Sequence, residues 1–525
     1  MNRTRPLRLS AALITVALIA ASCGSDRKTD SSTTVASTKP TTAASTAAPA
    51  GSTAETTAAT TAATTAATTA GSTAGSTGGS TAETTAATTA ATEAPTTVAA
   101  PTGPTFGDAP WPCGPAVGTN TDTGSEVGVT ADSVTIAGGD DAGYSGAPGL
   151  NHEMTDAMKA LVAKCNELGG INGRKIKFNY YDAQLLNVGP AIQGACDDKN
   201  FFLVGEGWAF DSNQEEIRLG CGLPAVPTYT VSAAFAMGKD VFNSVPNPAD
   251  ETPAGAFAQT TKLLGDAVQH VGALVANYSA TQETRDKAVA VAGSYGWKWA
   301  ETNLEYNVTG EADWTPFVKQ LQAAGATAVF WSGSCLPNLQ LYAQAAKANG
   351  FDVPIITDTN HYEAKCAAAN TDGALDNLYI RMSYIPFEEA NVNKATQDYL
   401  DLLKASGGDT SQLGMQATSS FLLWATAASA CGNQLTRACT LTNLAKTHSW
   451  TGHGLHAQSD PGGNHPPSCT VLIRLQGTTY KRVAPEKPGT YDCDKSWIAP
   501  VTGVPALAAA KLDANRISQQ FATGG

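Results

Sequence analysis

Four histidines fall close together near the end of the chain and are the first residues to test for metal chemistry: His448, His453, His456 and His465. Histidine metal sites depend on spacings that bring the imidazoles together, often beside paired cysteines. These four are irregularly spaced in a Gly/Pro-rich segment, and the sequence contains no Cys-x2-Cys pair. We interpret them as loop histidines and expect no metal and no other cofactor.

Two further patterns could carry catalysis or nucleotide binding. Gly205 and Gly207 follow an apolar run, but Phe210 stands where a dinucleotide-binding G-x-G-x-x-G loop needs its third glycine. The motifs G-x-S-x-G and H-E-x-x-H are both missing. Asp140-Asp141 follows another apolar run and is the remaining pair of candidate catalytic carboxylates. A hydrolase therefore stays as an alternative at this point.

The N-terminus has the composition of an export signal. Arginines precede an apolar run from Leu9 to Ala21, which is too short to cross a hydrocarbon core of about 30 Å. The segment 19–23 (IAASC) resembles a bacterial lipobox, with Ala20 where leucine is usual, which implies a diacylated Cys23. The alternative is an ordinary signal cut near Ala21. We expect a lipoprotein signal peptide at 1–22 and an exported protein anchored by lipid to the outer face of the cell membrane.

Residues 23–105 are rich in Thr, Ala and Ser and contain almost no large apolar side chain. Such a segment cannot bury a core, so we expect a disordered tether, of a kind that is often O-glycosylated. No later segment is long and apolar enough to span a bilayer. The formal net charge of -13 argues against nucleic acid as a partner.

Cysteine usage fits an exported protein. Of the 11 cysteines, setting Cys23 aside leaves an even number, which predicts disulfides. Connectivity is not fixed by sequence. Proximity suggests the pairs Cys196–Cys221, Cys335–Cys366, Cys431–Cys439 and Cys469–Cys493, which leaves Cys113–Cys165.

The region after residue 127 alternates short apolar runs with helical stretches. Strands are predicted at 134–137, 175–181, 201–204 and from 224, with helices between them, and the order then repeats from 257 to 357. This β-α-β-α order predicts an α/β fold with two mostly parallel sheets. Ligands of such sheets bind at the carboxyl ends of the strands.

Several of these segments resemble one family. Residues 129–136 (VTADSVTI), 165–176 (CNELGGINGRKI), 313–317 (DWTPF) and 321–326 (LQAAGA) are similar to segments of branched-chain amino-acid (Leu/Ile/Val) binding proteins of ABC transporters. Cys196 and Cys221 fall where some members carry a disulfide, and 452–467 with 470–475 resembles the family's late hairpin. The resemblance covers about 127–497.

The resemblance implies a type I periplasmic-binding fold, in which two lobes joined by a three-stranded hinge close on a ligand. We expect one lobe at 127–247 with 385–451, the other at 248–384 with 452–497, and a C-terminal tail at 498–525. The crossings would lie near Asn247, Tyr384 and Thr451. In this fold the loop of Asp140-Asp141 only borders the cleft, so we expect no enzyme.

The resemblance also implies ligand-binding residues in the first lobe. In relatives that bind amino acids, the loops after the third and fourth strands hold the ligand's carboxylate with hydroxyls and helix N-terminal amides. The matching loops here contain Trp208 and Ala209, then Thr230 and Ser232. Trp208 departs from the usual serine and would line or narrow the pocket.

Counterparts in the second lobe are Thr281 and Gln282, Cys335, and the segment from Asp358 to Asn360. Relatives place an acidic residue for the ligand's ammonium at the position of Thr359 or Asn360, and an aromatic residue near Cys335. Both are absent here, although Asp358 is adjacent. The α-amino-acid signature is therefore incomplete, which leaves open a ligand unlike leucine.

Two functions follow from these expectations. The first is a monomeric solute-binding lipoprotein that captures an amino acid, amide or small carboxylate for an ABC importer and presents it to a membrane permease. The alternative is a ligand sensor on the same fold that signals to a membrane partner.

Overall fold

The computed structural model of the protein describes residues 103–122, 124 and 126–521. The predicted signal peptide, Cys23 and nearly all of the predicted tether lie outside the described residues. Within the described residues, no helix is both long and apolar enough to cross a membrane. A short hairpin comes first, formed by β1 (Thr105–Phe106) and β2 (Ala109–Pro110).

The first sheet has four parallel strands in the order β4-β3-β5-β6. The strands are β3 (Ser133–Asp140), β4 (Lys175–Asp182), β5 (Phe202–Val204) and β6 (Ala225–Val226). The helices that follow them are α1 (Glu153–Leu168), α2 (Val188–Asp197), α3 (Ser212–Gly220) and α4 (Ala233–Ala236). This β-α alternation is the one that the apolar periodicity predicts.

The second sheet has eight strands, ordered β14-β13-β12-β11-β10-β8-β9 with β15 paired to β13. The strands from β8 to β12 run parallel, and β13, β14 and β15 are antiparallel additions. Its strands are β8 (Val271–Ala276), β9 (Trp299–Tyr306), β10 (Ala328–Ser332), β11 (Ile355–Thr357), β12 (Leu378–Met382), β13 (Cys469–Gln476), β14 (Thr479–Ala484) and β15 (Asp492–Cys493). Its helices are α5 (Gly255–Leu264), α6 (Ser279–Ala292), α7 (Thr315–Ala323), α8 (Gln340–Ala348) and α9 (Ala364–Ala369).

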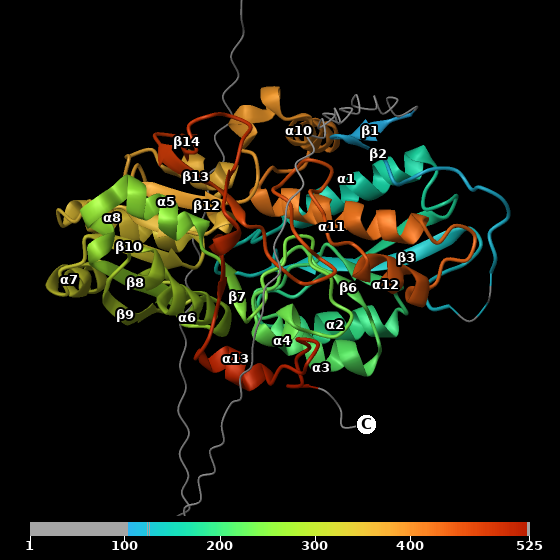
Figure 1. Ribbon diagram of the computed structural model, residues 1–525, viewed down its shortest axis with the longest axis horizontal. Helices are drawn as coiled ribbons and strands as arrows, with labels where there is room; N and C mark the ends of the chain where they lie inside the picture. The colour runs from blue at the N-terminus through green and yellow to red at the C-terminus, as the bar shows by residue number, and fades with distance from the viewer. Residues whose placement is uncertain (1–102, 123, 125, 522–525) are drawn as a thin grey trace, which may run out of the picture. The chain divides into compact units, whose positions relative to one another are not determined.

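After β12 the chain returns to the first sheet as three helices. These are α10 (Lys394–Ser406), α11 (Gln412–Ser429) and α12 (Arg437–Ala445). Helix α11 packs along α1 on the first-sheet side of the molecule (Figure 1). Short 3-10 or π turns occur at η1 (Gly265–Gln269), η2 (Gly293–Tyr295), η3 (Cys335–Leu339), η4 (Thr359–His361), η5 (Phe387–Val392) and η6 (Lys495–Trp497).

The turn between α1 and β4 shows why its sequence is so rich in glycine. Gly169, Gly170, Asn172 and Gly173 all have positive φ, a region that glycine and asparagine adopt at low cost. A Cβ on Gly170 would lie 2.1 Å from the backbone oxygen of Arg174. The buried Arg174 side chain in turn donates to the backbone oxygens of Thr130 and Asn433, which fixes the start of β4.

The chain passes between the two sheets three times, and the three crossings contact one another. The crossings lie between α4 and α5, between β12 and η5, and between α12 and β13. Ser459 Oγ donates to the Ser244 oxygen at 2.7 Å, and the Ala457 N–H donates to the Ser383 oxygen at 2.8 Å. The third crossing is longer than a simple hinge strand. Residues 452–467, which we expect to resemble a hairpin together with 470–475, form no regular strand, although Asp460 and His465 pair as an isolated antiparallel bridge. Residues 470–475 do lie in a regular hairpin, β13–β14.

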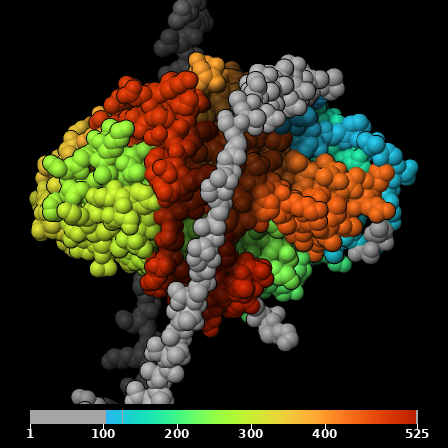
Figure 2. Space-filling view, in the orientation of Figure 1, coloured from blue at the N-terminus to red at the C-terminus, as the bar shows by residue number. Residues whose placement is uncertain are grey.

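The C-terminal segment is built into the same region. Strand β16 (Ile498–Pro500) pairs antiparallel with β7 (Glu251–Pro253), and α13 (Pro505–Ala510) packs against α4. The Arg516 guanidinium binds both carboxylate oxygens of Asp250 at 2.7 and 2.8 Å. Figure 2 shows the last part of the chain, in red, between the two halves of this face.

Five disulfides cross-link the part of the chain that the structure describes. They join Cys113–Cys165, Cys196–Cys221, Cys335–Cys366, Cys431–Cys439 and Cys469–Cys493, the pairs that proximity in the sequence suggests. The first, second and fourth lie in the first-sheet half, and the third and fifth lie in the second.

Candidate ligand-binding site

A cavity of about 300 Å³ lies where the loops at the carboxyl ends of both sheets face each other. The first sheet contributes the loops after β3, β5 and β6, and the second contributes those after β8, β10 and β11. The three crossings and the first turns of α11 complete the wall. Clefts of this size between two lobes are the usual place for a small-molecule site.

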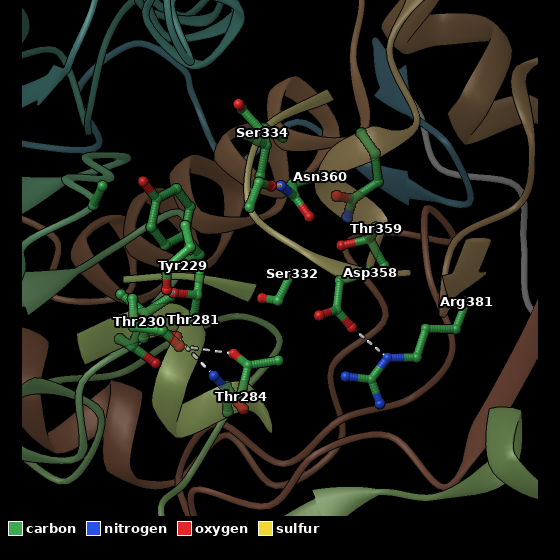
Figure 3. Close-up of a pocket in the computed structure, with 18 of the residues that line it drawn as sticks. Tyr229, Thr230, Thr281, Thr284, Ser332, Ser334, Asp358, Thr359, Asn360 and Arg381 are labelled. Carbon is green, nitrogen blue, oxygen red and sulfur yellow. Dashed lines mark hydrogen bonds and ion pairs between the residues drawn. The ribbon is translucent and has the colours of Figure 1, made fainter. Parts of the chain in front are cut away.

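Five of the nine residues proposed from the sequence line this cavity: Ala209, Thr230, Thr281, Asp358 and Asn360. Figure 3 shows Tyr229 and Thr230 on one side of the site and Asp358 on the other. Only Thr230 has a hydroxyl that is free to bind a ligand. Thr281 donates to the backbone oxygen of Ala276, and Asn360 donates to that of Gly333.

The other four lie outside the cavity, each for a local reason. Trp208 is fully buried among the apolar side chains beneath the first sheet. Ser232 uses its hydroxyl to cap α4, where it accepts from the Phe235 N–H. Gln282 donates to the carboxylate of Glu305, and Cys335 is bonded to Cys366. We therefore remove these four residues from the candidate site.

The backbone amides that the resemblance implies for a ligand carboxylate are already occupied. Asp141 accepts from the Ala209 N–H at 2.9 Å, and Asp211 accepts from the N–H groups of Val231 and Ser232 at 2.7 and 3.0 Å. Burial raises the pKa of each of these two carboxyls to about 7. The protein's own carboxylates thus stand where a ligand's carboxylate is expected.

Asp141 and its neighbour Asp140 are structural. Asp140 accepts hydrogen bonds from the hydroxyls of Thr155 and Tyr180, and its Oδ2 lies 2.9 Å from Nδ1 of His152. Asp141 accepts from the backbone of Ala209 and of Leu185. Neither Asp140 nor Asp141 is among the residues that line the cavity.

Several buried polar atoms on the cavity wall lack a hydrogen-bond partner among the described residues. They are Tyr144 Oη, Thr230 Oγ1, Asn338 Oδ1, Gln416 Oε1 and both amide atoms of Gln412. An unpaired buried polar group costs about 1–3 kcal/mol, so such groups are kept where a ligand or water completes them. Gln412 is fully buried and Thr230 is 2% exposed, so both depend on what fills the cavity.

Gln412 and Gln416 are not among the residues expected from the sequence, although their positions carry a signal for a polar site. They lie one turn apart at the start of α11, a helix whose side chains are buried on nearly every face. Two long amides on one face of such a helix need polar partners. The charged residues of the wall are Lys287, Asp358 and Arg381. Of these, only Asp358 is among the residues expected from the sequence.

The late histidines do not converge on a metal. His448 contacts Asp460, His465 contacts Glu251, and His456 contacts Ser419. Within residues 103–521 as described, one trio has the spacing of a metal site: Cys335, Glu363 and Cys366. Its two sulfur atoms form a disulfide, which leaves a single carboxylate ligand.

This fold and site define a two-lobed solute-binding protein with its cavity between the lobes. The family described as periplasmic binding protein matches residues 139–479, more than half of the 525 residues, and the chain belongs to that family. No curated protein matches the sequence.

Solved structures share the fold at low identity. A fatty acid ABC transporter substrate-binding protein from Thermomonospora curvata is 15% identical, with a TM-score of 0.58, over 69% of this chain and 94% of that one. A leucine-, isoleucine-, valine-, threonine- and alanine-binding protein from Brucella ovis, in a closed conformation, is 19% identical, with a TM-score of 0.55, over 71% and 95%. An ABC transporter solute-binding protein from R. palustris, in complex with 4-hydroxybenzoate, is 15% identical, with a TM-score of 0.56, over 67% and 96%.

Proposed function

We propose that this protein is the extracytoplasmic solute-binding component of an ABC importer. One observation carries the proposal: a cavity of about 300 Å³ between the two sheets, lined by buried polar atoms that lack partners among the described residues. Membership of the periplasmic binding protein family and the ABC-transporter relatives support it. The partner would be a membrane permease that recognises the closed form, and no chemical step is required of the protein.

The solute is a small molecule with both polar and apolar parts. The wall combines the hydroxyl of Thr230 and the amides of Gln412 and Gln416 with aromatic rings such as Tyr278 and Phe257. The structural relatives include binding proteins for amino acids and for a fatty acid, and one in complex with 4-hydroxybenzoate, so the shared fold leaves the ligand class open.

Lipid anchoring is part of the proposal. Cys23 follows a signal-like segment and precedes a long Thr/Ala/Ser tract. In cells, Cys23→Ser is expected to move the protein from the membrane fraction to the soluble exported fraction. Retention of this variant in the membrane fraction would contradict the anchor and leave solute binding untouched.

A thermal-shift screen of the purified protein tests solute binding. A solute that binds the folded form at a concentration 100 times its Kd stabilises the protein by about 2.7 kcal/mol, which raises the melting temperature by several degrees. We expect at least one amino acid, amide or small carboxylate to do so. A panel in which no solute shifts the melting temperature would contradict the proposed function.

A further inference from the structure

Lys287 brings an ammonium group to the cavity without an acidic partner. Its Nζ donates to Asn247 Oδ1 at 2.7 Å and to the Pro248 oxygen at 2.8 Å, and it forms no ion pair among the described residues. Burial, with the nearby charge of Arg381, lowers the pKa of Lys287 to about 8. An anion beside this ammonium would stabilise its charged form and offset the effects of burial and of Arg381.

Arg381 lies on the same side of the cavity. Its Nε is ion-paired with Asp358, as Figure 3 shows, and its guanidinium reaches the Pro253 oxygen at 3.5 Å and lies over the ring of Phe257. Lys287 and Arg381 thus contact the same crossing, 247–253. The remaining N–H groups of Arg381 are donors without an acidic partner among the described residues.

Asp358 is unsuited to the role that the resemblance implies. Its pairing with Arg381 neutralises the carboxylate that would otherwise attract a ligand's ammonium. On the first-sheet side, the amides that would attract a carboxylate are filled by Asp141 and Asp211. The carboxylate that would bind a ligand's ammonium and the amides that would bind its carboxylate are therefore both already bonded to side chains of this protein.

We propose that the cavity binds a carboxylate that lacks a neighbouring ammonium, with the carboxylate held by Lys287 and Arg381 beside the 247–253 crossing. The inference rests on the proposed function, because it names the class of solute that the same cavity takes. Lys287, Asp358 and Arg381 are the charged residues on the wall and sum to a net positive charge. This charge favours an anion over a zwitterion.

The rest of the wall suits an apolar body. Side chains that share this character are Leu150, Leu185, Val231, Val245, Phe257 and Leu413. The unpartnered groups of Thr230 and Gln412 are available for a second polar atom of the solute. The class is therefore an organic acid with an apolar chain or ring and, at most, neutral polar groups at its far end.

Calorimetric titration of the full mature protein with matched probes tests this class. The probes are 4-methylpentanoate, its amide and leucine, together with benzoate and benzamide. Each set keeps the apolar body and changes only the charged groups. We expect at least one carboxylate to bind, and its amide and α-amino counterparts to bind at least about tenfold more weakly.

Variants assign the effect to the two cations. Lys287→Gln is expected to weaken carboxylate binding about 10- to 100-fold while leaving the amide unchanged, and Lys287→Arg to restore most of it. The double variant Arg381→Gln with Asp358→Asn is expected to weaken carboxylate binding as well. Lys262→Gln, at an exposed lysine of α5, is the matched control and should bind as the original protein does.

The outcomes separate the inference from the function on which it rests. If leucine or an amide binds as tightly as its carboxylate, or Lys287→Gln keeps full carboxylate affinity, the inference is wrong and solute binding stands. If no probe of either series binds and the thermal-shift screen is also negative, the proposed function fails and the inference with it.

Discussion

The Glu283 carboxylate accepts a hydrogen bond of 2.8 Å from the Ala233 N–H, which joins helix α6 of the second-sheet half to helix α4 of the first. The rings of Phe210 and Tyr278 meet at the same boundary, with their centroids 5.1 Å apart. Lys365 adds an ion pair to Glu153 at 2.9 Å across another part of it. The two halves are therefore joined by contacts between the protein's own side chains and backbone.

Breaking this contact should loosen the closed form. Glu283→Ala removes a hydrogen bond worth about 1 kcal/mol, which shifts the balance between closed and open forms about fivefold toward the open one. Amide hydrogen exchange of the segment that contains Ala233 should rise accordingly. Glu305→Ala is the control, because Glu305 pairs with Arg285 and Gln282 inside the second-sheet half. Equal exchange of this segment in the original protein and in both variants would show that the hydrogen bond between Glu283 and Ala233 does not form in solution.

The buried amide of Gln412 should cost stability when the cavity holds no solute. Gln412→Met keeps the volume and removes two unpaired polar atoms, so it should raise the free energy of unfolding of the solute-free protein by about 1–2 kcal/mol. The same change should weaken the binding of any solute that contacts the amide. Urea unfolding measures the first effect, and Gln397→Met on the exposed face of α10 is the control. A loss of stability in Gln412→Met would mean that the amide is already satisfied.

Asp211 should make stability depend on pH. Burial raises its pKa from 3.8 to about 7, so the folded protein retains a proton that the unfolded chain releases near pH 4. Its contribution is therefore most favourable below about pH 4 and is lost as the pH rises through about 7. Asp211→Asn removes this titration. Relative to the original protein, the variant should gain about 1–3 kcal/mol between pH 5 and pH 8, measured by urea unfolding. Parallel pH profiles for the two proteins would contradict the raised pKa of Asp211.

The contribution of each disulfide to the free energy of unfolding should depend on the length of the loop that it closes. Cys113–Cys165 has a sequence separation of 52, and Cys431–Cys439 has one of 8. Loop-closure entropy then predicts losses of about 4 and about 2.5 kcal/mol when each pair is replaced by serines. Denaturant unfolding of the two double variants gives the comparison directly. A larger loss from the shorter loop would show that native contacts, not chain entropy, dominate.

The sequence predicts the fold well because its signals are local and repeated. The strand from 175 and the helix that ends at Leu168 follow from apolar periodicity, and the turn at 169–173 follows from its glycines. The strand β16 in the C-terminal segment could not be predicted from the sequence, because it is defined only by its pairing with β7, which is distant in the chain. Its composition alone resembles a loose tail.

The site was predicted only in part, because loop position does not reveal what a side chain bonds to. Thr230 and Asp358 fall at the cavity as expected, whereas Ser232 turns its hydroxyl to α4. The occupation of the Ala209 amide by Asp141 depends on two loops far apart in the sequence. Lys287 reaches the cavity because α6 faces the crossing at Asn247, a relationship that only the folded chain displays.

Mass spectrometry of the protein purified under native conditions tests the central claim most directly. We predict that the protein, with the Gln412→Met variant as its comparison, retains a small solute that is released on denaturation, and that the variant retains less of it. A protein that releases no solute, and to which no amino acid, amide or carboxylate binds when added, would contradict a solute-binding role for this cavity.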